Sequence, residues 1–235
     1  MADGIYVGMC GAAARTAELD AVADNLANAQ TPGFKASRPA FESFLPASGA
    51  PDKAYPASVA TAFDLRPGPT TRTGNPLDVT PEGSAFLAVE MESGGRGYTR
   101  NGQLSLDGEG RLVQNGRPVL DSSGAPINIP PGSSPTIDGS GVIHAGGVAV
   151  GQLGLFELQG RVDRVEGGLL APASGGSAES VEGKVRPGEV ELGNATPIDG
   201  MVQLISAQRH FDASMQALQT YRSIDQRSAE VGRVR

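Results

Sequence analysis

The two ends of the chain carry helical spacing, and the long middle between them does not. Residues 5–29 and 198–229 have apolar residues at intervals of three and four, the spacing of helices that pack along one stripe. The middle is rich in Gly, Pro and β-branched residues, which predicts short strands joined by turns. A chain that opens and closes with complementary helices around a β body favours a role in assembly over one in catalysis.

The first helix is predicted to end near residues 28–30, because Thr31-Pro32-Gly33 cannot continue it. An ordinary amphipathic helix that packs on its own domain would show the same apolar stripe. The stripe that we predict as an assembly seam consists of Ile5, Met9, Ala12, Leu19, Val22 and Leu26, with the small residues Thr16 and Ala23 in the same rhythm.

The closing helix has a clear predicted start, with Thr196 as N-cap, Pro197 at the first helical position and Asp199 three residues after the cap. A long apolar stripe in water promotes association. The two terminal helices could cover one another antiparallel, or cover copies in neighbouring subunits, and the spacing permits both. The predicted seam on this helix consists of Met201, Leu204, Ile205, Phe211, Met215 and Leu218, with Gln208 in the same row and Ile198 beside it.

Between the helices the sequence contains two segments of different composition. Residues 36–76 contain many prolines and little periodicity, which predicts an extended connector. Residues 77–193 contain short apolar runs separated by turn signals, which predicts a mainly antiparallel β domain. The expected fold class is therefore α+β, with residues 1–35 and 194–235 forming a terminal helical domain.

Three dipeptides predict tight turns in this β domain. Asn115-Gly116 lies between two apolar runs and is the strongest two-residue hairpin signal. Asp107-Gly108 and Asp138-Gly139 predict two further turns.

The composition argues against several functional classes. The net charge of −7 disfavours nucleic acid as a partner. One Cys and two His make a His/Cys zinc site improbable, and no catalytic or phosphate-binding motif is found, so we expect neither an enzyme nor a cofactor. The N-terminus lacks the pattern of a cleaved signal peptide, and no apolar run is long enough for membrane insertion.

The segment that follows the first stripe resembles the N-terminal signature of bacterial flagellar rod and hook proteins, A-N-L-A-N-x-x-T-x-G-[FY]-K. Asp24 is the one departure, standing where a small residue or Asn is usual. Leu26 ends the stripe, Asn28 can help to terminate the helix, Gly33 allows a backbone turn and Phe34 can anchor the chain. The matching residues are Asn25, Leu26, Ala27, Asn28, Thr31, Gly33, Phe34 and Lys35.

The resemblance extends over nearly the whole chain. Residues 208–213 and 218–220 are similar to the closing helix of the family, although Gly200 stands where Glu is usual. Residues 75–79, 97–102 and 110–113 are similar to the central pattern of rod proteins, and residues 127–133 and 150–156 to the proximal-rod type.

This resemblance implies a structural axial subunit of the flagellar basal body. In the family, the terminal helices pair into a coiled coil, and copies stack into a tube with the β domain outside. The implied partners are the chain itself, other rod proteins and the flagellar type III export apparatus. The implied location is the rod that crosses the periplasm, reached without signal cleavage, where it transmits motor torque to the hook.

Two alternatives remain open on the sequence. The first is a distal-rod or hook-type axial protein. The second is a secreted β-domain enzyme or glycan-binding protein, which would need a cleft with convergent carboxylates.

Overall fold

The computed structural model of the protein describes residues 2–44 and 55–233, and they form two compact units. The helical unit consists of residues 1–27, 37–62 and 196–235, and the β unit of residues 28–36 and 63–195. Each unit is described by itself below. The chain has a helix at each end and a mostly antiparallel β region between them, as predicted.

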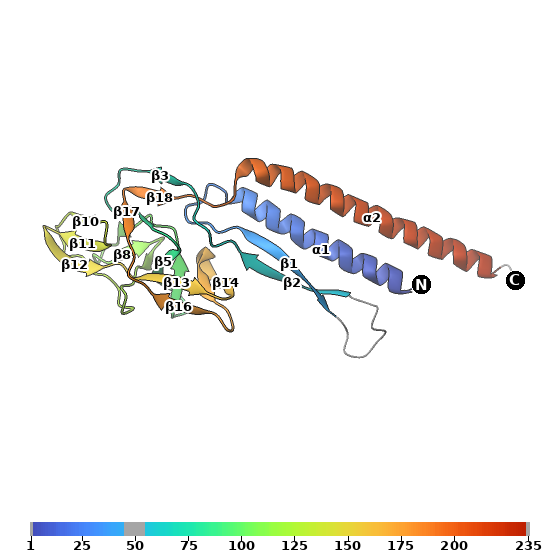
Figure 1. The fold of residues 1–235 in the computed structure, drawn as a ribbon, viewed down its shortest axis with the longest axis horizontal. Helices are drawn as coiled ribbons and strands as arrows, with labels where there is room; N and C mark the ends of the chain where they lie inside the picture. The colour runs from blue at the N-terminus through green and yellow to red at the C-terminus, as the bar shows by residue number, and fades with distance from the viewer. Residues whose placement is uncertain (1, 45–54, 234–235) are drawn as a thin grey trace. The chain divides into compact units, whose positions relative to one another are not determined.

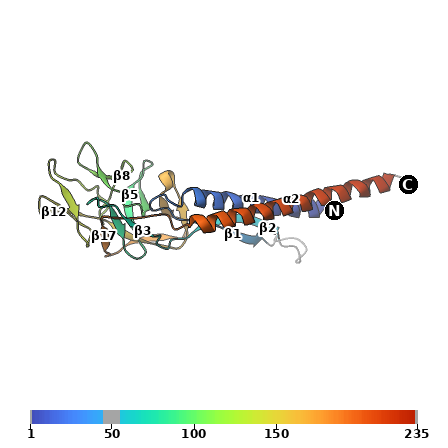
Figure 2. The same cartoon turned by 90° about the horizontal axis from the view of Figure 1, so that it is seen from above.

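The helical unit is built on two long helices, α1 (Ala2–Ala27) and α2 (Pro197–Arg233). They lie side by side and antiparallel, so that the start of α1 and the end of α2 are at the same end of the pair (Figures 1 and 2). The start of α2 meets the end of α1, since a Cβ on Gly200 would lie 3.2 Å from a methyl carbon of Leu26. Within the described residues, neither helix combines the length and apolar character needed to cross a membrane.

Both helices begin and end close to the predicted residues. The first helix ends at Ala27 and is followed by a turn over residues 28–30. The second begins at Pro197, whose missing N–H and fixed φ suit the first helical position. The Thr196 hydroxyl donates a hydrogen bond to the Asp199 carboxylate, which closes the first turn.

The segment predicted as an extended connector folds differently. β1 (Ser37–Phe44) and β2 (Tyr55–Phe63) pair as a two-stranded sheet, and β1 packs against α1 in the helical unit. Further along, β3 (Thr70–Arg72) joins the β unit. Proline does not prevent this pairing. In a two-stranded sheet each strand has one unpaired edge, and a proline, which lacks an N–H, costs no hydrogen bond there.

The β unit contains several small antiparallel sheets around one larger sheet. Its largest sheet has six strands in the order β14-β15-β6-β5-β13-β16. Three-stranded sheets β10-β11-β12 and β7-β8-β9 and the pairs β17-β4 and β18-β3 complete it. The strands are β4 (Val79–Pro81), β5 (Ala85–Glu90), β6 (Arg96–Thr99), β7 (Ser105–Leu106), β8 (Leu112–Gln114), β9 (Arg117–Pro118), β10 (Pro135–Ile137), β11 (Val142–Ala145), β12 (Val148–Gln152), β13 (Leu155–Gln159), β14 (Val162–Arg164), β15 (Leu170–Pro172), β16 (Ser177–Ser180), β17 (Val185–Pro187) and β18 (Glu189–Glu191), with a short 3₁₀ helix at Glu166–Gly168.

Strand β5 lies at the centre of the core and is buried on both faces. Leu87 and Val89 point into one apolar cluster, together with Leu112 and Ile143. The alternate residue Phe86 points into a second cluster on the other face. Burial on both faces explains why this strand has a continuous apolar sequence without alternation.

The predicted hairpin at Asn115-Gly116 is present. Gln114 pairs with Arg117 across the turn, and the two central residues have φ of 48° and 80°. Positive φ at both central positions is the requirement of a type I′ turn, which Asn-Gly satisfies at low cost.

Three other turns share one hydrogen-bonding pattern, and only two of them were predicted. Asp107, Asp121 and Asp138 each accept at one carboxylate oxygen from backbone N–H groups two and four residues later. Each turn closes with a glycine three residues after the Asp, at φ of 80°, 93° and 80°. Hydrogen bonds from the side chains of Arg111, Ser123 and Ser140, together with these backbone hydrogen bonds, hold the pKa of the three carboxyl groups below the usual value.

Candidate functional site

The residues that follow α1 pass through the β unit in a fixed conformation. Gly33 has φ of 69°, and its N–H donates to the Glu191 carbonyl at 2.8 Å. A Cβ at this position would lie 2.1 Å from the Asn101 nitrogen, so a side chain has neither the conformation nor the space it needs. The predicted backbone turn at Gly33 is thus required by a close approach between two segments.

The Phe34 ring is held by a guanidinium group. Arg164 lies 4.6 Å from the centroid of Phe34 and 5.0 Å from that of Phe63, which is the range of cation–π contacts. Its guanidinium also donates to the Lys35 carbonyl at 2.7 Å. Phe34 therefore anchors the chain, as the sequence suggested, through a partner that the sequence did not indicate.

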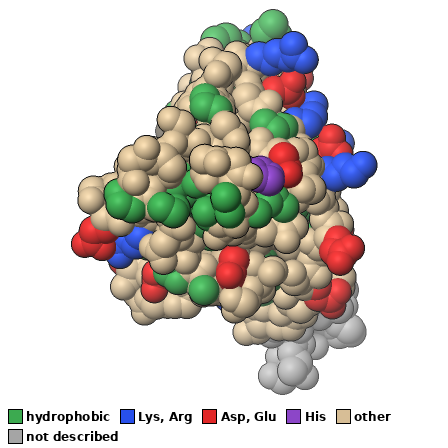
Figure 3. All heavy atoms as spheres, turned by 90° about the vertical axis from the view of Figure 1, so that its left-hand side faces the viewer, with side chains coloured by type: hydrophobic (Ala, Val, Ile, Leu, Met, Phe, Trp, Pro, Cys, Tyr) green, Lys and Arg blue, Asp and Glu red, His purple; other side chains and the backbone are tan. Residues whose placement is uncertain are grey.

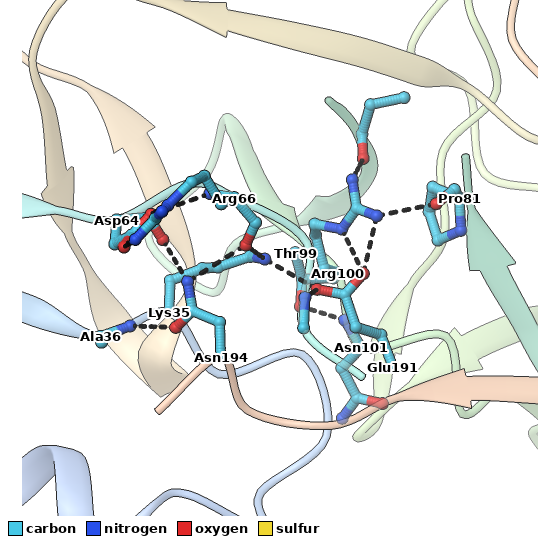
Figure 4. A network of polar contacts seen from close by, with 12 residues as sticks. Lys35, Ala36, Asp64, Arg66, Pro81, Thr99, Arg100, Asn101, Glu191 and Asn194 are labelled. Atoms are coloured by element: carbon cyan, nitrogen blue, oxygen red, sulfur yellow. Dashed lines mark hydrogen bonds and ion pairs between the residues drawn. The ribbon is translucent and has the colours of Figure 1, made fainter. Parts of the chain in front are cut away.

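Lys35 is buried, with only 3% of its surface exposed. Its ammonium donates to Glu191 Oε1 and to the Arg66 carbonyl, both at 2.7 Å (Figure 4). Burial lowers the pKa of Lys35 from its usual value, and the Glu191 carboxylate opposes this shift. The same carboxylate oxygen also accepts the Gly68 N–H at 2.9 Å.

Arg100 binds the other side of the same carboxylate. Its Nε and Nη2 lie 2.7 and 2.6 Å from Glu191 Oε2, with both side chains essentially unexposed (Figure 4). The remaining N–H groups of Arg100 donate to the carbonyls of Pro81, Gly83 and Ala85, each at 2.7 Å. All five N–H groups therefore have acceptors, which is the condition for burying a guanidinium.

Two Asn residues of the motif bind backbone groups. In the helical unit, the Asn25 amide donates to the Ser37 carbonyl and accepts the Ser37 N–H, both at 2.8 Å. In the β unit, the Asn28 carbonyl accepts the Thr31 N–H at 2.9 Å, and its side chain accepts the Thr31 hydroxyl at 3.2 Å. Ala27 is the last residue of α1 and is exposed.

The covered row of α2 contains three residues of the predicted seam and three small residues outside it. Of the predicted seam residues, Leu218 is 7% exposed, and Leu204 and Phe211 are half-buried. Small residues at 200, 207 and 214 complete the covered row, and α1 is the element that packs on α2. Small side chains in this row allow the two helices to approach closely.

The other predicted seam residues of α2 are exposed. Met201, Ile205 and Met215 are 56%, 52% and 38% exposed. Together with Ile198 at 79% and Val202 at 64%, Met201 and Ile205 lie on the face of the first turns opposite the covered row, given 100° per residue. We call Ile198, Met201, Val202 and Ile205 the α2 patch.

The predicted seam of α1 is also divided between two faces. Val22 is buried, and Ala12, Leu19 and Leu26 are half-buried. Met9 is 54% exposed, whereas the Ile5 side chain lies outside the described residues.

The β unit has an apolar surface of its own. Figure 3 shows hydrophobic side chains gathered in a band across the end that carries β10, β11 and β12. Val148 on β12 is 67% exposed. Over the described residues, no three His, Cys, Asp or Glu side chains are grouped closely enough to hold a metal ion.

Comparison with known proteins gives three family matches along the chain. Residues 5–35 match "Flagella basal body rod protein", residues 82–145 match "Flagellar hook protein FlgE/F/G D1 domain", and residues 186–231 match "Flagellar basal body rod FlgEFG protein C-terminal". The chain is 36% identical to the flagellar basal-body rod protein FlgF of Salmonella typhimurium over 234 residues, which is 91% of this chain and 92% of that protein. The chain belongs to the flagellar basal-body rod protein family.

Within the rod protein family, the relatives named FlgF are the more similar. The FlgF of Mesorhizobium japonicum is 32% identical over 90% of both chains. The FlgG of Buchnera aphidicola from Schizaphis graminum is 26% identical over 94% of this chain and 96% of that protein. The chain is thus a rod protein of the FlgF type, which confirms the predicted type.

The sequence did not indicate which residues of the rod protein bind the motif. No role was predicted for Arg100, Arg164, Glu191 or Asn194. Arg164 contacts Phe34 and the Lys35 carbonyl. Glu191 binds Gly33 and Lys35, and Arg100 binds Glu191. A signal was present at the end of β18, where Glu191 lies between the apolar residues Val190 and Leu192. An acid in such a place is either exposed or paired with buried cations.

Proposed function

We propose that this chain is an axial subunit of the proximal rod that assembles with its own copies and with other rod proteins into a helical tube. In this role it transmits motor torque to the hook. The family of the chain is one of structural rod proteins, and its relatives are named flagellar basal-body rod proteins.

The observation that supports assembly best is the α2 patch. Four adjacent large apolar side chains at more than half exposure are costly in water, and burial against a neighbour would recover about 1.5–3 kcal/mol for each. Because the opposite face of α2 is already covered by α1, the patch is free for a neighbouring subunit. We propose that the terminal helices complete a coiled coil there.

We further propose that the subunit passes through the flagellar type III export apparatus without signal cleavage and takes its place where the rod crosses the periplasm. Recovery of the protein from purified basal bodies with residues 1–8 intact by mass spectrometry would support this route. Loss of those residues would contradict it.

Charged substitutions in the α2 patch test the assembly role. Met201→Asp and Ile205→Asp should each abolish rod completion and swimming, because they place a charge in a contact that excludes water. Gln203→Asp, an exposed neighbour outside the patch, is the matched control and should leave swimming intact. Circular dichroism of the purified subunits should show the same helix content in all three. Complete basal bodies with either patch variant would refute the assignment of this surface.

A further inference from the structure

The chain passes between its two compact units four times. It crosses from one unit to the other after residues 27, 36, 62 and 195. The β unit therefore has four chain ends, which begin or finish at Asn28, Ala36, Phe63 and Ala195. Something must hold these four ends in place, because each is connected to a segment that lies outside the β fold.

The Asn194 side chain binds two of these ends and belongs to a third (Figure 4). Its Oδ1 accepts the Ala36 N–H at 2.7 Å. Its Nδ2 donates to the Asp64 carbonyl at 2.6 Å and to the Arg66 carbonyl at 3.1 Å. Asn194 is itself next to Ala195, the last residue of the β unit. Its side-chain amide therefore connects the ends at 36, 63 and 195.

The preceding residue meets the remaining end. A Cβ on Gly193 would lie 2.6 Å from the Ala29 carbonyl oxygen and 2.8 Å from that of Asn28. The backbone at Gly193 therefore touches the first residues after α1, and only glycine leaves room for this approach. Gly193 and Asn194 together contact all four ends.

Backbone hydrogen bonds join the same segments to one another. The Asn194 N–H donates to the Phe34 carbonyl at 3.3 Å, and the Asp64 N–H donates to the Ala36 carbonyl at 2.8 Å. The Arg66 carbonyl that accepts from Asn194 also accepts the Lys35 ammonium, so this group of contacts is continuous with the buried Glu191 network.

We infer that Gly193 and Asn194 form a clamp that holds the four ends of the β unit together, so that force arriving along any one of them is shared by all four. Bonds loaded together resist force better than bonds loaded in sequence, since no single end can be peeled away first. The clamp rests on the contacts above, and its mechanical consequence rests on the proposed torque-transmitting role.

Hydrogen exchange on the purified full chain tests the clamp directly. Asn194→Ala removes the acceptor of the Ala36 amide, and the exchange of that amide should become about tenfold faster, the effect of one lost hydrogen bond. Asn128→Ala, a substitution of the same kind at an exposed position, is the control and should leave the Ala36 amide unchanged. Gly193→Ala should instead accelerate exchange at Thr31, whose N–H donates to the displaced Asn28 carbonyl.

Unchanged protection of Ala36 in Asn194→Ala would overturn the clamp. Cells that carry Asn194→Ala should lose swimming speed in viscous medium relative to cells with Asn128→Ala, and equal speeds would overturn the sharing of force. A strain that lacks the whole gene and still swims would refute the proposed function. Faster exchange of the Ala36 amide in Asn194→Ala would still support the clamp in that case.

Discussion

Glu191 lies between Lys35 and Arg100 with its side chain unexposed, and these cations come from positions 156 and 91 residues away in sequence. One carboxylate thus connects the segment after α1, the segment after β6 and strand β18. Two buried cations share this one carboxylate. Loss of its negative charge would therefore leave both cations uncompensated. Among the described residues, the other acceptors of Lys35 and Arg100 are neutral backbone carbonyls, so Glu191 supplies the negative charge that is bonded to both.

Neutralising this carboxylate should strongly destabilise the β unit. Glu191→Gln keeps the shape of the side chain but leaves two buried cations without a counter-charge, at an expected cost of about 3–5 kcal/mol. Urea denaturation of the purified protein measures this cost. Glu82→Gln removes a half-exposed carboxylate 4.0 Å from Arg186 and should cost less than about 1 kcal/mol. Similar losses in the two variants would contradict the role assigned to Glu191.

At the scale of elements, α2 carries one apolar row that α1 covers and a second group of apolar residues that is exposed. Intervals of three and four residues fit both rows, although the row through Leu204 and Phe211 and the residues Met201 and Ile205 lie on different faces of the helix. The seam predicted from the sequence therefore included residues from both. Packing of α1 separates them, because it covers one row and leaves the other exposed.

The two rows should respond differently to charge. Phe211→Asp should weaken the pairing of α1 with α2 in the free subunit by about 2 kcal/mol, because the charge enters a covered contact. Ile205→Asp should leave that pairing unchanged, since its side chain is already in water. Helix content followed by circular dichroism during thermal unfolding distinguishes them. Equal loss of helix stability in both variants would show that the rows are wrongly assigned.

At the scale of the whole molecule, the chain forms two compact units with separate cores. The helical unit depends on the contact between α1 and α2, and the β unit on two apolar clusters around β5. Multi-unit proteins often depart from two-state unfolding. The separate cores therefore predict two unfolding steps.

Calorimetry of the full chain should resolve these two transitions. Glu191→Gln should lower the temperature of one transition, and Phe211→Asp the temperature of the other, because the two residues belong to different units. The unchanged transition in each variant serves as the internal control. A single transition that both variants shift equally would argue for one cooperative unit.

Much of this organisation follows from local sequence signals. Helix periodicity, the stop at residues 31–33, the Pro197 start and the Asn115-Gly116 turn each depend on residues within a few positions of one another. Together with the motif at Asn25–Lys35, they predicted the fold class and the family. They failed at residues 37–63, where proline suggested a connector and β1 and β2 pair instead.

The amino-acid sequence alone determined which segments are helical, where several tight turns lie and which family the motif resembles, because those features are encoded over short separations. Only the tertiary structure decided which row of α2 is covered, what surrounds Lys35 and how Asn194 connects the chain ends. Those outcomes depend on groups more than a hundred residues apart, such as Lys35 and Glu191, whose approach leaves no periodic trace in the sequence.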